Sequence, residues 1–278
     1  MISAAQLRAQ LGVCVILDCR FDLADTGAGL REYRAAHIPG AHYLHLEDDL
    51  SGPRGTHGGR HPLPSPAVFT TRLAQLGIQR DTPVVAYDDS RFCFAARLWW
   101  MMTALGYTDV RLLDGGFAAW RSSGFETARA MPEGQPGAAQ PSAVQPGAVQ
   151  PGAAPDVGAF AGVVDRSELQ LLSTQDVLLV DSRDARRYAG LEEPIDPVAG
   201  HIPGAVNLPW QGVTDERGFA RPARQQRERW EALGPSSDTV VYCGSGVSAC
   251  VNLLSLELAG YDRARLYPGS WSDWCSYL

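Results

Sequence analysis

The stretch VILDCR at residues 15–20 has a counterpart in the second half of the chain, LLVDSR at residues 178–183. Each is a short apolar run that ends in an aspartate and, two positions later, an arginine. Such a run predicts a buried β-strand that leads into a loop. Two copies of it so far apart in one chain indicate an internal duplication.

Four further blocks follow each copy in the same order. The motif HIPGA occurs at residues 37–41 and again at 201–205. The other pairs are VVAY and TVVY, ALGY and LAGY, and LLDGGFAAW and LYPGSWSDW. Short apolar runs alternate with longer amphipathic stretches such as 69–76 and 249–258, so each half is predicted to be an α/β domain with a parallel sheet flanked by helices.

The length of the chain and its proline pattern give the domain boundaries. With 278 residues it is long enough for two domains. Residues 130–157 are rich in proline, glycine, alanine and glutamine, a composition that predicts an extended linker rather than a core. We therefore expect domains at residues 1–129 and 158–278.

The overall charge and the cysteines exclude several classes of protein. A net charge of −7 disfavours binding to nucleic acid or to anionic membranes, and no apolar stretch is long enough to span a bilayer. The six cysteines form neither a CxxC pair nor the framework of a disulfide-rich secreted domain. We expect a cytoplasmic protein with reduced thiols and with no metal or organic cofactor.

The sequence CGSGVSA at residues 243–249 follows a predicted strand and begins a predicted helix. Gly244 and Gly246 allow the backbone to curl so that successive amides point inward, and the helix dipole adds positive potential. That arrangement stabilises a thiolate or a persulfide on Cys243, although a core cysteine beside a helix cap fits the loop alone equally well. The loop lacks the lysine of a phosphate-binding P-loop, and Ala249 stands where a cysteine-dependent phosphatase has its arginine.

The duplicated halves, the two HIPGA motifs, the CGSGVSA loop and GSWSDW at residues 269–274 resemble the tandem rhodanese sulfurtransferases. The loop is most similar to that of the 3-mercaptopyruvate sulfurtransferases, with Ser248 in place of the usual threonine. The resemblance implies a catalytic C-terminal rhodanese domain with Cys243 as nucleophile. It also implies a non-catalytic N-terminal rhodanese-like domain, in which Asp88 stands at the place of the cysteine.

The resemblance further implies how a substrate would bind. Arg187 corresponds to the arginine that holds the substrate carboxylate in the family. Many 3-mercaptopyruvate enzymes have a second arginine nine residues later, where this chain has Asp196. The loop residues Gly244, Gly246, Val247 and Ser248 are expected to contact the substrate.

A proton relay is implied by three more residues. Ser245 lies in the loop, and His61 precedes a leucine and a proline in a way that matches the family's histidine. An acid within residues 47–49, with Asp49 slightly favoured, would orient His61. Together they would deliver a proton to the pyruvate enolate. A loop histidine without a catalytic role is the alternative for His61.

The expected reaction moves sulfur from 3-mercaptopyruvate through a Cys243 persulfide to a thiol or cyanide, with a thioredoxin-like protein as a candidate acceptor, and it releases pyruvate. One alternative keeps the persulfide but takes the sulfur from thiosulfate. A second alternative, from another functional class, is a non-catalytic sulfur carrier or scaffold.

Overall fold

The structure is a computed structural model that describes residues 1–129, 158–172, 177–234 and 238–278. The expected linker at residues 130–157 lies outside the described residues. In the N-terminal half, helices and strands alternate along the chain. They are α1 (Ala4–Arg8), β1 (Val15–Asp18), α2 (Ala28–Ala35), β2 (Ala41–Tyr43), α3 (Pro66–Gln75), β3 (Val84–Tyr87), α4 (Ala95–Ala104), β4 (Val110–Leu112) and α5 (Gly116–Ser122).

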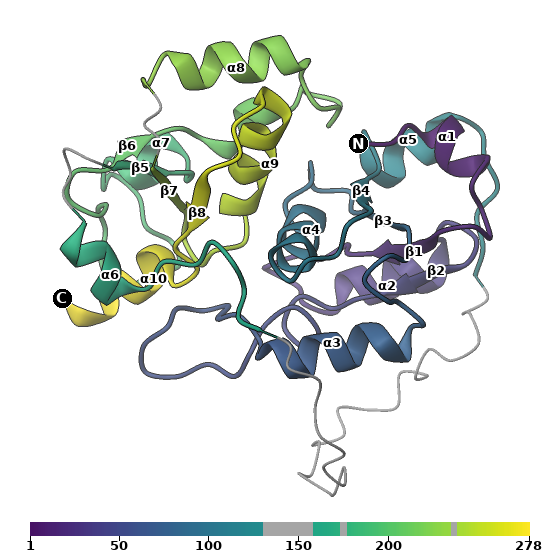
Figure 1. Ribbon diagram of the computed structural model, residues 1–278, viewed down its shortest axis with the longest axis horizontal. Coiled ribbons are helices and arrows are strands. Elements are labelled where there is room, and N and C mark those ends of the chain that lie inside the picture. The colour runs from purple at the N-terminus through teal and green to yellow at the C-terminus, as the bar shows by residue number, and fades with distance from the viewer. Residues whose placement is uncertain (130–157, 173–176, 235–237) are drawn as a thin grey trace, which may run out of the picture.

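The C-terminal half has the same alternation of helices and strands. Its elements are α6 (Arg166–Leu171), β5 (Leu178–Asp181), α7 (Ala185–Tyr188), β6 (Val206–Asn207), the 3-10 turn η1 (Trp210–Val213), α8 (Ala223–Glu231), β7 (Thr239–Tyr242), α9 (Ala249–Ala259), β8 (Ala264–Leu266), α10 (Ser270–Trp274) and the 3-10 turn η2 (Cys275–Tyr277). Figure 1 shows the two halves as separate lobes, each built around its own sheet.

Both sheets are parallel, four-stranded and identical in topology. Their strand orders are β2-β1-β3-β4 and β6-β5-β7-β8. The register is also duplicated, because Asp18 pairs with Tyr87 in one sheet and Asp181 pairs with Tyr242 in the other. The predicted fold class, two tandem α/β domains with parallel sheets, is confirmed.

The duplicated motifs have the same structural roles in both halves. Arg20 pairs with Asp18 at 2.6 Å, and Arg183 pairs with Asp181 at 2.6 Å. In each HIPGA turn the histidine Nδ1 contacts a backbone carbonyl, at 2.6 Å for His37 and at 2.8 Å for His201. Both histidine rings also stack on a tyrosine. These groups stabilise the fold.

One hydrophobic core runs across the boundary between the halves. Alternate strand residues face opposite sides of a sheet, and the inward set includes Leu17 and Ala86 in one half and Val180 and Val241 in the other. Helices α4 and α9 pack against each other between the two sheets (Figure 1). This apolar contact holds the lobes in one arrangement, and it places the loop before α9 against the N-terminal half.

The expected amphipathic stretches differ in how they are buried. Helix α3 is amphipathic, with Phe69 and Leu73 buried, and it begins before residue 69 because Ser65 accepts a hydrogen bond from the amide of Val68. Helix α9 was predicted to be amphipathic, which is wrong: its residues from Ala249 to Leu256 are all buried. It is covered by its own sheet, by α4 and by α8, so that no face is left to solvent along this stretch.

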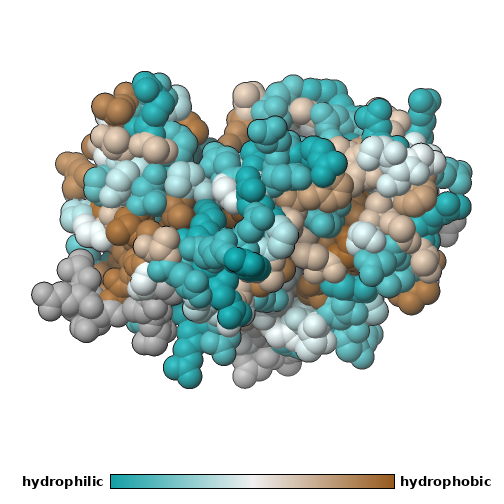
Figure 2. Space-filling model, turned by 90° about the horizontal axis from the view of Figure 1, so that it is seen from above, coloured by the Kyte–Doolittle hydropathy of each residue, from teal (hydrophilic) through white to brown (hydrophobic). Residues whose placement is uncertain are grey.

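Among the described residues, no helix is long and apolar enough to cross a bilayer. Figure 2 shows hydrophilic residues over much of one face, with hydrophobic residues in separate patches between them.

Candidate active site

Cys243 follows the last residue of β7, and its side chain is buried, with 1% of the residue exposed. Its amide donates to the Ser270 hydroxyl at 3.1 Å, and its carbonyl accepts from the Trp271 amide at 3.0 Å. The turn that begins α10 therefore fixes the backbone on both sides of the cysteine. The terminal GSWSDW motif contributes to the site in this way.

The loop after Cys243 requires glycine at position 246. Gly246 has a φ of +73°, and a Cβ atom added there would lie 2.4 Å from the carbonyl oxygen of Pro268. Only glycine adopts this backbone at so close an approach without strain. Val247 is buried in the core that joins the two halves, and Ser248 is the N-cap residue of α9.

The amides of this loop are available to a ligand. Within the described part of the chain, the N–H groups of Gly244, Ser245, Gly246, Val247 and Ser248 donate no hydrogen bond. Buried amides nearly always have an acceptor, so an unpaired run of them indicates a place for an anion.

The equivalent loop of the N-terminal half, which follows β3, surrounds an anionic side chain. Asp88 follows β3 as Cys243 follows β7, and its carboxylate accepts hydrogen bonds from the amides of Ser90, Phe92, Phe94 and Ala95 at 2.9–3.0 Å. Burial raises the pKa of Asp88, and these four amides oppose the rise. The loop geometry of this fold therefore surrounds one anionic group with backbone donors.

Ser245 and His61 meet across the boundary between the halves. The hydroxyl of Ser245 lies 2.8 Å from Nδ1 of His61, and both side chains are buried. Nε2 of His61 has no hydrogen-bond partner among the described residues. Burial, followed by the charges of Arg97, Arg54 and Arg60, lowers the pKa of His61 to about 3. The ring is therefore neutral at physiological pH, and its Nδ1 shares a hydrogen bond with the Ser245 hydroxyl.

The structure does not bring Asp49 to His61. The carboxylate of Asp49 accepts from Nε of Arg72 at 2.6 Å and from the amide of His45 at 2.7 Å. With Nε2 of His61 unpaired, the described residues hold a serine–histidine pair without the expected acid. Asp49 instead holds its own turn against α3.

Arg187 is placed by a capped helix. Asp184 caps α7 by accepting from the amides of Arg186 and Arg187. The Arg187 guanidinium binds Glu193 at 2.6 Å and Asp196 at 3.4 Å. A Cβ atom added at Gly244 would lie 3.5 Å from its Nη2, so the guanidinium borders the Cys243 loop.

Two arginines that border the site were not predicted from the sequence. Nη2 of Arg60 would lie 3.0 Å from a Cβ atom added at Gly244, and Arg60 also pairs with Asp196. Arg97 is fully buried in α4 and donates to the carbonyls of Gly246, at 2.9 Å, and His61, at 3.0 Å. Arg97 could have been found as the one charge in the apolar run AARLWWMM, and Arg60 by its place directly before His61.

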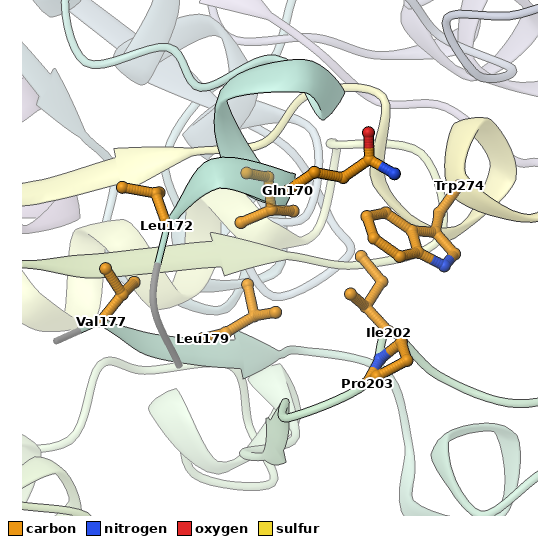
Figure 3. A pocket seen from close by; sticks show the side chains of 8 residues that line it. Gln170, Leu172, Val177, Leu179, Ile202, Pro203 and Trp274 are labelled. Carbon is orange, nitrogen blue, oxygen red and sulfur yellow. The ribbon is translucent and has the colours of Figure 1, made fainter. Parts of the chain in front are cut away.

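A separate cavity of about 280 Å³ lies elsewhere on the C-terminal half (Figure 3). It is lined by Leu169, Gln170, Leu172, Val177, Leu179, Ile202, Pro203 and Trp274. None of these side chains ionises, and Cys243 is not among them. The described lining of the cavity therefore offers no group for nucleophilic or acid–base chemistry.

Because the pKa of His61 is low in the folded protein, the free energy of unfolding should depend on pH. In the unfolded chain a histidine has a pKa of about 6.5, so between that value and about 3 only the unfolded chain takes up a proton. The part of the folding stability that depends on keeping His61 neutral is fully present above pH 6.5 and is lost as the pH falls toward 3. At pH 5 the loss is about 2 kcal/mol. We expect the decrease in free energy of unfolding between pH 7 and pH 5, measured by urea denaturation, to be about that much smaller in His61→Gln.

The control for this experiment is His57→Gln in the same loop, because His57 is exposed. It should show the wild-type decrease. Equal decreases in wild type and His61→Gln would contradict the burial of a neutral His61.

Comparison with known proteins assigns the fold to a family. The rhodanese-like domain matches residues 3–123 and again 166–277. The chain belongs to the rhodanese-like family. A protein of Pseudomonas aeruginosa named "Probable 3-mercaptopyruvate sulfurtransferase" is 44% identical over 99% of this chain and 94% of its own length. A thiosulfate sulfurtransferase of Cricetulus griseus is 31% identical over 93% of this chain and 84% of its own length.

A solved structure supports the same assignment. The 3-mercaptopyruvate sulfurtransferase from Leishmania major superposes with a TM-score of 0.82 and 29% identity, covering 100% of this chain and 74% of that one. The protein is a sulfurtransferase enzyme that acts on small-molecule sulfur donors. The alternative of a non-catalytic carrier or scaffold is therefore wrong.

Proposed function

We propose that this enzyme takes sulfur from 3-mercaptopyruvate, carries it as a persulfide on Cys243 and passes it to a thiol or to cyanide. Residues 158–278 would form the catalytic domain. Residues 1–129 would form a non-catalytic domain that lends His61 to the site. The relatives from Pseudomonas aeruginosa and Leishmania major are named for this donor.

In the first step the Cys243 thiolate attacks the sulfur of 3-mercaptopyruvate. A sulfur–sulfur bond forms, the carbon–sulfur bond breaks, and its electron pair stays on the departing carbon as the enolate of pyruvate. The outer sulfur of the persulfide would lie among the unpaired amides of residues 244–248, and the equivalent loop of the N-terminal half surrounds the Asp88 carboxylate with amide donors in the same way.

The observation that carries the choice of donor is the contact between Ser245 and His61 at 2.8 Å. An enolate must gain a proton to become pyruvate, and the proton that the donor's thiol loses as the persulfide anion forms can reach it through the Ser245 hydroxyl and the His61 ring. Sulfite, the product that thiosulfate would leave, needs no proton on carbon. A buried serine–histidine pair beside the nucleophile therefore favours mercaptopyruvate.

The environment of the loop favours the same donor. Arg187 borders Gly244, and although Glu193 occupies its Nε and Nη2, its Nη1 can donate to a carboxylate oxygen of the donor. The loop itself carries no charged side chain, whereas a doubly charged donor would favour cations there.

The second half of the reaction needs a nucleophilic acceptor. A thiol or cyanide attacks the outer sulfur and restores the thiolate, and a thioredoxin-like protein is a candidate thiol donor. All six cysteines are unpaired, which fits the reducing cytoplasm as the proposed compartment.

The test compares the two donors at matched concentrations. We expect pyruvate release from 3-mercaptopyruvate, with cyanide as acceptor, to exceed thiocyanate formation from thiosulfate by at least about tenfold in kcat/KM, which corresponds to 1.4 kcal/mol of transition-state binding. A preference for thiosulfate would overturn the proposed donor and leave the alternative enzyme, a thiosulfate sulfurtransferase.

A further inference from the structure

Two guanidinium groups from different halves of the chain meet at the Cys243 loop. Arg60 comes from the N-terminal half and Arg187 from the C-terminal half. If Gly244 carried a Cβ atom, Nη2 of Arg60 would lie 3.0 Å from it, and Nη2 and Nη1 of Arg187 would lie 3.5 and 3.6 Å from it. The two arginines therefore converge on one point next to the nucleophile.

Asp196 holds this pair together. One of its carboxylate oxygens pairs with Nη1 of Arg60 and the other with Nη2 of Arg187. The Asp196 side chain is 2% exposed, so this bridge is shielded from water and from competing ions. The bridge fixes Arg60 relative to Arg187 although the two residues belong to different domains.

Each arginine keeps a donor that is not used by the bridge. Nη2 of Arg60 and Nη1 of Arg187 have no hydrogen-bond partner among the described residues, and both of these nitrogens face Gly244. Two unpaired N–H groups from separate guanidinium groups provide a site for the two oxygens of a carboxylate.

The exposure of these groups orients a ligand. The Arg60 and Arg187 side chains are 22% and 15% exposed, whereas Cys243 is 1% exposed. The guanidinium groups therefore lie at the outer end of the site and the sulfur at its inner end. A donor with a carboxylate at one end and a thiol at the other matches this polarity.

We propose that Arg60 binds the carboxylate of the sulfur donor together with Arg187, so that the N-terminal half determines the preference for a carboxylate-bearing donor. This inference rests on the proposed function. It assigns the non-catalytic domain a substrate-binding residue directly before the histidine that it lends to the site.

The test uses two donors that differ by the carboxylate. One is 3-mercaptopyruvate, and the other is mercaptoacetone, in which a methyl group replaces the carboxylate. Both leave an enolate that needs the proton from Ser245 and His61. In Arg60→Ala we expect KM for 3-mercaptopyruvate to rise by about 10- to 100-fold, the factor for one charged hydrogen bond, while kcat/KM for mercaptoacetone stays within about twofold. Arg60→Lys should recover part of the loss, because lysine keeps the positive charge but lacks the planar guanidinium with its parallel N–H donors.

Arg186→Ala is the matched control. It removes one arginine next to Arg187, but the Arg186 side chain is 63% exposed and pairs with Glu192 at the surface. Both donors should react with it as with the wild type.

The outcomes separate this inference from the proposed function. If Arg60→Ala slows both donors by the same factor, Arg60 acts through His61 or the fold, and the inference is overturned. An unchanged KM for 3-mercaptopyruvate overturns it as well. If the wild type releases no pyruvate at all, the proposed function fails; the inference is then decided by titrating pyruvate into wild type and Arg60→Ala, where equal affinities overturn it.

Discussion

Cys243→Ser is expected to lower pyruvate release from 3-mercaptopyruvate by at least about 10³-fold, because a serine hydroxyl is not ionised at neutral pH and cannot form the persulfide. The fold should be preserved, since serine differs from cysteine by one atom and the backbone contacts to Ser270 and Trp271 remain. After exposure to the donor without an acceptor, intact-mass spectrometry should show an added sulfur of roughly 32 Da on the wild type and none on the variant.

Cys14→Ser is the control for this experiment. It makes the same substitution in the cysteine directly before β1, whose thiol donates to the carbonyl of Gln10. This variant should gain the sulfur and release pyruvate as the wild type does. A sulfur adduct that persists in Cys243→Ser would show that another cysteine is the carrier.

The fold could be predicted because its signals are local and occur twice. Each strand is a short apolar run, and the two copies of VILDCR and LLVDSR fix the same ion pairs in both halves. The failure at α9 has a tertiary cause. A sequence pattern shows that a helix has an apolar face, but it does not show that a second helix, α4, will cover the other face.

The site could be predicted only where its residues belong to a motif. Cys243 and Ser245 lie in one loop, and the structure places His61 beside Ser245. Asp49 was chosen by its position in the sequence, and the structure pairs it with Arg72. The sequence around Asp49 does not show whether it pairs with Arg72 or with His61, because that depends on how the chain folds between these residues.

The contribution of Arg60 could not be predicted because it depends on a contact across 136 positions of sequence. Asp196 stands where many 3-mercaptopyruvate enzymes have a second arginine, so the sequence of the C-terminal half alone offers one positive charge fewer for a carboxylate. In the structure this aspartate instead holds an arginine from the other domain at the same loop. The absence of a second arginine in the C-terminal domain therefore did not show how many arginines border the site, because Arg60 comes from the N-terminal domain.

Asp88→Ala is expected to have the largest effect on stability, about 3–5 kcal/mol. The substitution removes a buried carboxylate and leaves the amides of Ser90, Phe92, Phe94 and Ala95 without an acceptor. Arg91 and Phe92 adopt φ of 58° and 71°, a left-handed backbone that costs about 1–3 kcal/mol per residue and that the Asp88 carboxylate helps to hold. Urea denaturation followed by tryptophan fluorescence measures the loss.

Asp89→Ala is the matched control, because Asp89 is exposed and accepts one hydrogen bond, from the amide of Ala118. It should cost less than about 1 kcal/mol. Asp88→Asn should be intermediate, since its amide nitrogen would face donors rather than acceptors. If Asp88→Ala costs no more than Asp89→Ala, the loop does not depend on an anion at this position. The proposal that the same loop geometry holds the Cys243 persulfide would then lose its internal precedent.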